Sequence, residues 1–439
     1  MEESQNEKRP ARKLTVRNFS VIKHAELEFG KITVLIGPQA HGKSLLCKLA
    51  YFLGGEIVAT AVESLINKNS WQEFLQTIVR DFHSRFSTNG WLKTSFRASF
   101  SSQQYTVGLR GVGDPLSPGI QFSFSEEFQE LYASISNNPA KQPSYANMSR
   151  SELRQDLWIE LSLLQNRERT QANTFIPSGR AFFTVTGKSV AVLQNPDLDW
   201  ITRRFAGQIT WDTRWKAGLL TTGRGVVQEI EKELYRIAGG LVAIVEDKPL
   251  FLSWDGRHLP LPLLSSGTQE LLPMFSMMNY LAFHSEHFYA RSNSTRIPPL
   301  AEISEYSPLI YLEEPEAHVF PGTQHELVKL FAWLARDPVL SFDWIITTHS
   351  PYVLSAFNNL IYAGQLGRDE TISRKIPIEE KYWIEPGAFA AYSIHDGLRE
   401  PILSKSGLID GEYLDSVSES IGREFDSLLR LEYDKTKAS

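Results

Sequence analysis

The stretch KITVLIGPQAHGKSLLCKLAYFL, residues 31–53, decides the fold of this 439-residue chain. Residues 31–36 predict a short buried strand because they are rich in β-branched side chains. Residues 37–44 then fit the pattern G-x-x-x-x-G-K-[ST], and residues 44–53 resume as a helix. A strand, a glycine-bounded loop and a helix in this order are the context that a phosphate-binding motif requires.

The loop between this strand and this helix predicts a nucleotide site. Its backbone N–H groups and the helix N-terminus form a cradle for anions. Lys43 is expected to reach the β- and γ-phosphates, and the Ser44 hydroxyl is expected to bind Mg²⁺. We give the His41 ring no catalytic role, and a chance Gly/Lys turn is the alternative to the whole site. The predicted ATP-binding residues are Gly37, Pro38, Gln39, Ala40, His41, Gly42, Lys43 and Ser44.

A second apolar stretch, residues 307–312, predicts a buried strand that ends at Glu313-Glu314-Pro315. Carboxylates at such a strand tip can bind Mg²⁺ beside the phosphate loop and can orient or deprotonate the attacking water. We therefore assign Glu313 to the metal and Glu314 to the water. The alternative is a solvated acidic loop, since Glu is usually exposed.

A third apolar stretch, residues 342–348, leads to His349-Ser350-Pro351. A histidine at a strand tip can donate a hydrogen bond to the γ-phosphate and sense its presence, so His349 is assigned this catalytic role. A structural histidine is the alternative. His318 is expected at a dimer contact, and His325 on a helix face.

A fourth stretch, LLSSGTQE at residues 263–270, precedes an apolar helix predicted over residues 270–283. Ser266 and Gly267 at a helix start make an anion-binding N-terminus from a hydroxyl, backbone amides and the helix dipole. A second phosphate site in one chain most simply serves the γ-phosphate held by another subunit. An ordinary serine N-cap is the alternative.

In this order, the four stretches resemble the ATP-binding cassette (ABC) ATPase superfamily, in its non-transporter branch with the SMC, RecF and overcoming-lysogenization-defect (OLD) ATPases. LEEPEAHVFP, residues 312–321, is very similar to the Walker B and D-loop stretch of OLD-type ATPases. The resemblance covers residues 10–60 and 240–360. It implies an α/β fold: an ABC-ATPase head of the P-loop NTPase class, with a mixed sheet, an antiparallel β extension and a helical insertion.

In that family, two heads enclose two ATP molecules with Mg²⁺, so the resemblance implies a homodimer or higher homo-oligomer. It implies that Lys43, Ser44, Glu313, Glu314 and His349 act on the ATP of their own head. It also implies that Ser266, Gly267 and Gln269 act on the ATP of the partner.

Two departures from the family pattern stand out. In the signature, usually L-S-G-G-Q, Ser265 replaces the leucine and Thr268 the second glycine. Because Thr268 lacks the freedom of glycine at positive φ, the contact in trans is expected to be looser. The family's Q-loop glutamine is not placed, and its candidates are Gln103, Gln104 and Gln121.

Composition limits the class of protein. The chain is 42% hydrophobic, with a net charge of −6 that gives no overall drive towards nucleic acid. No apolar run of 18 residues lacks charges and no secretory signal is visible, so we expect a cytoplasmic protein without a membrane partner. Cys47, the single cysteine, excludes an intrachain disulfide.

The chain is expected to divide into an N-terminal ATPase lobe (1–125), a mainly helical insertion (126–240) and a C-terminal ATPase lobe (241–439). Within these parts, alternating residues at 95–125 predict antiparallel strands and residues 241–262 a hairpin. Further expectations are helices at 151–173, 197–238 and 411–433, a loop at 137–150 and a strand at 359–363.

Arginines outside the four motifs have several interpretations. Arg180, after an apolar strand at residues 174–176, is expected to touch phosphate or to hold the two lobes together, with a structural ion pair as the alternative. Basic residues interleaved with tryptophans leave nucleic-acid binding open against a solvated face. They are Arg150, Arg154, Arg167, Arg169, Arg203, Arg204, Arg214 and Lys216, near Trp200, Trp211 and Trp215.

Three functions compete. The first is an ATPase that dimerises around ATP and regulates a separate effector, a nuclease or a toxin, resembling ATPase subunits of anti-phage systems of the Septu, retron-associated and PARIS types. The second is a DNA-repair ATPase of RecF or SMC style that clamps DNA. A transporter ATPase fits the long insertions less well. No acidic Toprim cluster or HNH signature follows His349, so we expect no nuclease activity from this chain.

Overall fold

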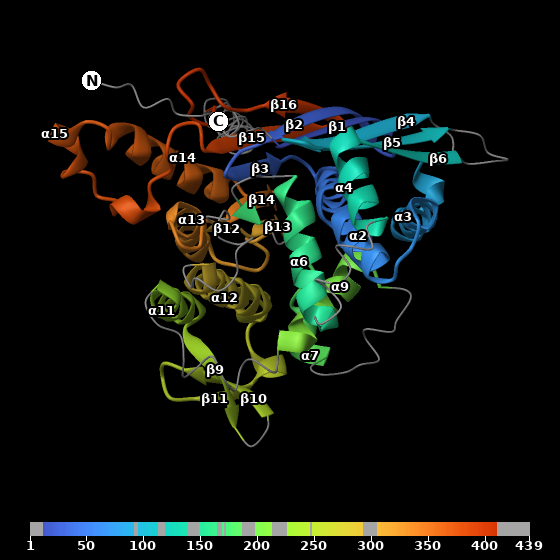
Figure 1. Cartoon of the computed structure of the whole chain (residues 1–439). Helices are drawn as coiled ribbons and strands as arrows, with labels where there is room; N and C mark the ends of the chain where they lie inside the picture. Colours follow the sequence, from blue (N-terminus) through green and yellow to red (C-terminus); the bar gives the residue numbers. More distant parts are fainter. Residues whose placement is uncertain are drawn as a thin grey trace, which may run out of the picture.

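The computed structural model describes residues 12–91, 95–112, 119–137, 149–164, 169–170, 173–186, 198–212, 226–245, 248–292 and 305–410. Its central element is an 11-stranded mixed sheet in the order β6-β5-β4-β1-β2-β16-β15-β3-β14-β13-β8, with helices packed against it (Figure 1). The predicted α/β class with a mixed sheet is therefore confirmed.

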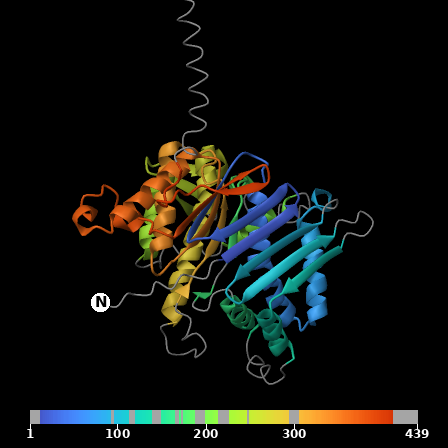
Figure 2. The same ribbon diagram turned by 90° about the horizontal axis from the view of Figure 1, so that it is seen from above.

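One half of the sheet is antiparallel and confirms the strands expected at residues 95–125. Alternate residues of β1 are buried, as the period of a half-exposed strand requires. Seen from above, no helix of the described residues covers the outer face of this half (Figure 2). Its strands are β1 (Arg12–Phe19), β2 (Ile22–Phe29), β4 (Phe96–Ser102), β5 (Tyr105–Val112) and β6 (Gly119–Phe124).

The other half is parallel, and its strands are buried on both faces. In β13, Tyr311 packs into the core on one side of the sheet and Ile310 into the core on the other. The parallel strands are β3 (Ile32–Ile36), β8 (Asn173–Ile176), β13 (Leu309–Glu313), β14 (Asp343–Thr348) and β15 (Phe389–His395). β16 (Leu398–Pro401) joins the two halves, because it is antiparallel to β15 and parallel to β2.

Helices cover both faces of the parallel half (Figure 1). One core lies under α1 (Lys43–Tyr51), α2 (Ile57–Ile66), α3 (Trp71–Arg85), α4 (Glu126–Ser136) and α6 (Arg150–Leu163). The other lies under α11 (Val226–Ala238), α12 (Ser266–Ser292), α13 (Pro321–Arg336) and α14 (Pro351–Leu366), while α9 (Trp200–Asp212) contributes to both. Two short helices are α7 (Phe182–Thr186) and α15 (Glu370–Ser373).

Two small sheets complete the fold. β9 (Gly240–Val245) and β10 (Lys248–Ser253) form the predicted hairpin, which β11 (His258–Pro260) extends just before α12. β7 (Arg169–Thr170) and β12 (Glu305–Tyr306) pair in parallel.

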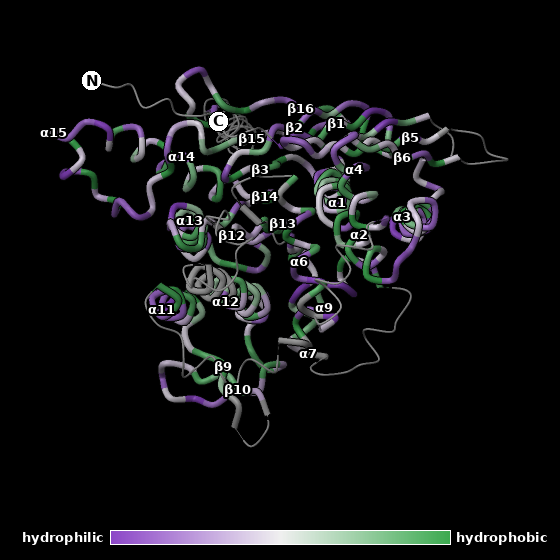
Figure 3. The backbone as a smooth tube through the Cα atoms, viewed as in Figure 1, coloured by the Kyte–Doolittle hydropathy of each residue, from purple (hydrophilic) through white to green (hydrophobic). Residues whose placement is uncertain are grey.

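The helix that follows the phosphate loop is long and apolar (Figure 3). α1 and α2 are continuous through a π-helical turn, Phe52–Glu56, and the 24 residues from Lys43 to Ile66 are apolar enough to span a membrane by length and composition. Of its most apolar 18-residue window, 78% is buried inside the protein, which is the property of a core helix.

The strand expected at residues 359–363 is wrong, because these residues lie in the middle of α14. Ser350 caps this helix by accepting a hydrogen bond from the Val353 N–H, and Pro351 occupies its first turn. Apolar residues then recur at helical spacing, at Val353, Leu354, Phe357, Leu360 and Ile361, and all are buried.

The structure also bears on the predicted helices, the predicted loop and the three-part division. The helix expected at 151–173 is confirmed only up to Leu163, where α6 ends, because β7 and the start of β8 lie in the rest of that range. α9 and α11 confirm the helical residues expected at 197–238 where the structure describes them, whereas the helix at 411–433 and most of the loop at 137–150 lie outside the described residues. The three-part division stays a prediction. The large sheet takes strands from all three parts, because β8 pairs with β13.

A buried charge cluster joins the antiparallel and parallel halves. Asp343, at the start of β14, pairs with Arg12 of β1 and with Lys31 just before β3, each at 2.8 Å. Arg12 and Asp343 are both buried. The three side chains therefore fix the first strand against the strand that carries the phosphate loop.

Removing the central carboxylate tests this cluster. Asp343→Ala leaves two cations without their partner, and should lower the free energy of unfolding by about 3–5 kcal/mol. Urea denaturation measures the loss. Asp255→Ala, which breaks the exposed pair with Arg257, should leave the denaturation midpoint unchanged. Equal effects of the two substitutions would show that the cluster does not stabilise the junction.

Candidate nucleotide-binding site

The carboxyl ends of the parallel strands meet at one edge of the sheet. Gly37 follows β3, His349 follows β14, and Glu313 ends β13. The turn after β8 lies beside them, because β8 runs parallel to β13. Crevices at the carboxyl ends of parallel strands are the usual ligand sites of open α/β sheets, so the predicted site residues share the expected edge.

Two glycines give the phosphate loop its shape. Gly37 has φ 148° and Gly42 has φ 104°, both of which disfavour any other residue. A Cβ at Gly37 would lie 2.2 Å from the Ile394 oxygen, and one at Gly42 would lie 2.2 Å from Ile22 Cδ1. The loop is therefore pressed between the β1–β2 hairpin and β15, with Gln39 and Ala40 exposed at its tip.

Lys43 lies at the base of the loop, where its side chain is buried. Its Nζ donates hydrogen bonds to the oxygens of Gly37, at 2.7 Å, and Pro38, at 2.8 Å. Burial lowers the pKa of the Lys43 ammonium, while the carboxylates of Glu314 and Glu316 oppose this shift. The loop thus encloses a cation that can exchange carbonyl partners for phosphate oxygens.

Glu313 suits a divalent cation. Its side chain is only 5% exposed, and its Oε1 atom is buried without a hydrogen-bond partner. Burial raises the pKa of its carboxyl, whereas Lys48 and a hydrogen bond from Ser44 lower it. A buried carboxylate with a spare oxygen beside a hydroxyl fits the oxygen ligands that Mg²⁺ takes. Glu313 and Ser44 are therefore the residues that would hold Mg²⁺, which supplies charge stabilisation at the phosphates.

Glu314 and His349 are brought together. Glu314 Oε1 lies 3.4 Å from His349 Nε2. Glu314 has φ 43°, a conformation that costs strain in a residue with a Cβ, and its N–H donates to the Thr347 oxygen at 2.9 Å. The two side chains that we assigned to the water and to the γ-phosphate thus face each other across the tips of β13 and β14.

Glu316 is a site residue that the sequence reasoning missed. Its Oε1 accepts hydrogen bonds from the Thr348 hydroxyl, at 2.8 Å, and from the His349 N–H, at 2.6 Å. It therefore positions the backbone of His349. The only signal in the sequence was a third acidic residue two positions after the Glu pair.

Arg180 is fully buried, and it connects three parts of the site. It donates to the backbone oxygens of Glu313 at 2.7 Å, Glu314 at 3.0 Å and Glu270 at 3.1 Å, and to that of Pro177. It also pairs with the Glu270 carboxylate at 3.3 Å. Of the roles open to it, the structure supports the one that holds elements together, since the side chain has no exposed surface to offer phosphate.

The signature stretch begins α12, with one difference from expectation. Ser265, rather than Ser266, caps the helix, because its hydroxyl accepts the Thr268 N–H at 3.3 Å. Thr268 lies in the first helical turn, where ordinary right-handed geometry suffices and the freedom of glycine is not needed. Gly267 is close to the loop after β13, since a Cβ there would lie 2.7 Å from the His318 oxygen.

The other predicted signature residues take different positions. Ser266 is exposed, whereas the Gln269 side chain donates to the oxygens of Pro262 and Leu264, each at 3.0 Å. Gln269 thus supports the turn of its own chain in this structure. The roles of Ser266, Gly267 and Gln269 in trans stay predictions, as does the dimer contact of His318.

The Q-loop candidates lie away from the phosphate loop in the fold. Gln103 and Gln104 form the β4–β5 turn, and Gln121 lies on the outermost strand, β6. The expected site residue is therefore still not placed. His325 lies on α13, as expected.

The sheet order and this edge define an α/β P-loop NTPase. Residues 117–354, more than half of the chain, match the family described as "AAA ATPase domain". The chain belongs to this family. The matched range includes the signature, the Glu pair and His349, and it begins after the phosphate loop at residues 37–44.

The fold is similar to several solved structures. One is a crystal structure of an SMC head bound to the C-winged helix domain of ScpA. It has 11% identity and a TM-score of 0.40, and the match covers 90% of this chain and 97% of that one. The SMC head domain from Thermotoga maritima has 10% identity and a TM-score of 0.36, with coverages of 90% and 98%. The recombination mediator protein RecF has 13% identity and a TM-score of 0.31, with coverages of 90% and 99%. No curated protein matches the sequence.

Replacing Glu313 tests the electrostatics of the metal position. A carboxyl whose pKa is raised on folding lowers the free energy of unfolding progressively as the pH rises from its unfolded-state pKa to its folded-state pKa. Without nucleotide, Glu313→Gln should therefore raise the free energy of unfolding at pH 7.5. The gain should vanish below about pH 4, where the carboxyl is protonated in both states.

Glu326→Gln is the matched control for Glu313→Gln. Burial raises the pKa of Glu326, but hydrogen bonds from Lys329 and Arg236 outweigh it and lower the pKa overall. This substitution should therefore decrease stability at pH 7.5, the opposite sign. Urea denaturation at both pH values measures the two effects, and a loss of stability in Glu313→Gln at pH 7.5 would contradict the electrostatic account.

Proposed function

We propose that this chain binds ATP with Mg²⁺ at the edge described above and hydrolyses it to ADP and phosphate. One observation carries the proposal: Lys43, the Glu313–Ser44 pair and the Glu314–His349 pair converge at the ends of three adjacent parallel strands. Lys43 binds the β- and γ-phosphates, and Ser44 with Glu313 holds the cation. Glu314 orients or deprotonates the water, and His349 donates to the γ-phosphate.

The strained backbone of Glu314 supports its catalytic role. Strain at a residue persists where the surrounding structure imposes it. Here the Glu314 N–H is bonded to β14 and its oxygen to Arg180. The side chain is about one-third exposed, so water can reach the carboxylate beside His349.

We further propose that two copies enclose two ATP molecules, with Ser266 and Gly267 of each copy on the γ-phosphate of the other. Large apolar side chains flank the motifs and remain exposed in the single chain: Leu263 (73%) before the signature, Phe320 (78%) after the Glu pair and Tyr352 (58%) after His349. Large apolar side chains that are exposed beside binding motifs favour an interface there. The resemblance of residues 312–321 to OLD-type ATPases supports a regulatory role in anti-phage defence, in which the oligomer controls a separate nuclease or toxin.

Blocking hydrolysis without removing the nucleotide tests the ATPase proposal. Glu314→Gln should keep ATP affinity, slow hydrolysis by about 100-fold or more, and accumulate a dimer in ATP. Phosphate release and light scattering after size exclusion measure these effects. Lys43→Ala, the comparison variant, should lose nucleotide binding and remain monomeric. Normal turnover in Glu314→Gln would reject its assignment, and an ATP-bound monomer would reject the dimer.

A DNA-clamping function has one specific observation in its favour. Arg17, Arg97 and Arg110 stand opposite one another in register on β1, β4 and β5. All three are exposed, and within the described residues none pairs with an acidic side chain. They line a hollow of about 420 Å³. The strands that carry them form the part of the sheet seen without a covering helix in Figure 2. Like charges directly opposite on neighbouring strands are unfavourable, so an anion that bridges them would stabilise the row.

The basic residues that the sequence analysis suggested for nucleic-acid binding fit that role less well than the row of Arg17, Arg97 and Arg110. Arg154 pairs with Glu63, and Arg204 pairs with Glu56 and bonds the Tyr51 hydroxyl. These side chains hold helices together. Arg167, Arg214 and Lys216 lie outside the described residues.

Charge reversal in the arginine row tests the DNA alternative. Arg97→Glu should weaken binding to duplex DNA by roughly tenfold or more and reduce its dependence on salt, because phosphate contacts release counterions. Fluorescence anisotropy over a salt series measures both. Arg257→Glu, with the same charge change on the exposed β10–β11 turn, should bind as the unmodified chain does. Equal affinities for all three proteins would reject this surface.

A further inference from the structure

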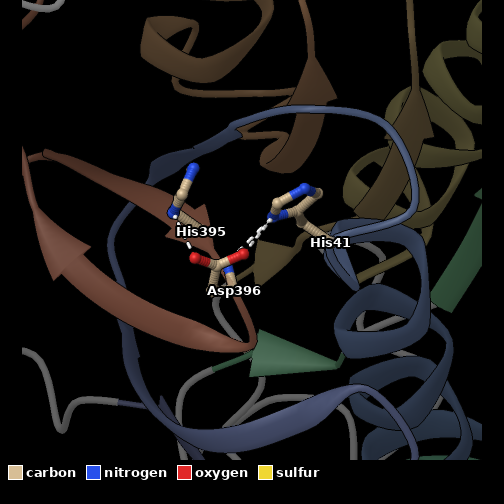
Figure 4. A group of neighbouring side chains, drawn as sticks. All are labelled: His41, His395 and Asp396. Carbon is tan, nitrogen blue, oxygen red and sulfur yellow. Dashed lines mark hydrogen bonds and ion pairs between the residues drawn. The ribbon is translucent and has the colours of Figure 1, made fainter.

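Two imidazoles and a carboxylate meet beside the phosphate loop without a role in the proposed ATPase chemistry. His41 belongs to the loop, while His395 and Asp396 lie where β15 ends, more than 350 residues later in the chain. Figure 4 shows Asp396 between the two rings, with one carboxylate oxygen towards each. Asp396 Oδ2 lies 3.2 Å from His395 Nδ1, and Oδ1 lies 3.7 Å from His41 Nδ1.

We propose that His41, His395 and Asp396 form a binding site for a divalent transition-metal ion of the Zn²⁺ class. One ligand atom from each residue can be chosen so that all three lie within 4.8 Å of one another. Zinc–ligand bonds near 2.1 Å with tetrahedral angles place neighbouring ligand atoms about 3.4 Å apart. Each histidine nitrogen lies near this distance from one oxygen of Asp396, at 3.2 Å and 3.7 Å. Because these are two different oxygens and the limit for the three ligand atoms is 4.8 Å, side-chain rotation is needed to bring one atom of each residue to coordination distance.

The backbone around the cluster is held rigidly. Asp396 and Gly397 have φ 49° and 75°, the left-handed pair of a tight hairpin turn. The Gly397 oxygen accepts the N–H groups of Lys23, at 2.8 Å, and His24, at 3.1 Å. A Cβ at Gly397 would lie 2.0 Å from the Val21 oxygen. The turn is thus fixed against the β1–β2 hairpin, and the ligands on it are preorganised.

The ligand set selects the class of metal. Imidazole nitrogens favour Zn²⁺, Co²⁺, Ni²⁺ or Cu²⁺, whereas Mg²⁺ prefers oxygen ligands. Three protein ligands with solvent access leave a coordination position open, since the side chains of His395 and Asp396 are 61% and 64% exposed. The Asp396 N–H donates to His41 Nδ1 at 2.8 Å. Coordination through that nitrogen replaces this hydrogen bond.

Metal occupancy would act on the phosphate loop, a consequence that rests on the proposed ATPase function. His41 lies two residues before Lys43, so a bound ion ties the loop to the β15–β16 turn. If the bound ion changes the affinity for ATP by some factor, then ATP must change the affinity for the ion by the same factor.

Zinc titration of the full chain without nucleotide tests the site itself. Calorimetry should show one Zn²⁺ per chain, and Co²⁺ should give the visible absorption of a low-symmetry site. His395→Ala and Asp396→Asn should each weaken Zn²⁺ by roughly tenfold or more. Asparagine tolerates the left-handed conformation of position 396, so that variant keeps the turn. His258→Ala removes an exposed histidine on β11 and should bind Zn²⁺ like the unmodified chain.

Unchanged Zn²⁺ affinity in His395→Ala and Asp396→Asn would overturn the site, as would an equal loss in His258→Ala. The link to nucleotide is tested separately, by titrating fluorescent ATP with free Zn²⁺ set by a metal buffer. Zn²⁺ should change ATP affinity in the unmodified chain and not in His395→Ala. Identical ATP affinity with and without bound Zn²⁺ would refute the link, and absence of ATP binding in both proteins would refute the proposed ATPase.

Discussion

The buried guanidinium of Arg180 is the interaction on which the geometry of the site depends. A charged group without solvent contact is tolerated only when its donors are satisfied. Arg180 meets this condition with four backbone oxygens and one carboxylate, taken from the turn after β8, the end of β13 and Glu270 near the start of α12. Movement of any one of these elements would leave donors unpaired, so the three are fixed together.

This arrangement places strain and uncompensated charge where the chemistry is proposed. Arg180 and Thr347 hold Glu314 at positive φ, and Glu313 keeps a buried oxygen without a partner. Glu316 likewise has a buried Oε2 without a hydrogen bond, beside the one that fixes His349. Each feature costs stability, and the proposed binding of ATP with its cation would recover that cost. The hydrophobic cores on both faces of the sheet supply enough stability for the fold to tolerate this cost.

The sequence predicted local elements well wherever one physical signal dominated. Apolar stretches followed by glycine, glutamate or histidine predicted β3, β13 and β14. The structure places their carboxyl ends at one edge, because the three strands are parallel. Residues 359–363 failed because β-branched and aromatic side chains in a five-residue window outweighed the helical spacing of a longer stretch. Arg180 and Glu316 act through backbone atoms of distant segments, and no local pattern reports such contacts.

β15 and β16 show why the rest of the site was out of reach. Their residues form a strand and a hairpin of ordinary composition, and no motif marks them. Yet β15 pairs with β3, and its Ile394 oxygen lies where a side chain at Gly37 would go. The phosphate loop therefore owes its shape to a strand that follows it by some 350 residues. The P-loop pattern in the sequence contains the glycine that packing against β15 requires, but the pattern does not predict β15 itself.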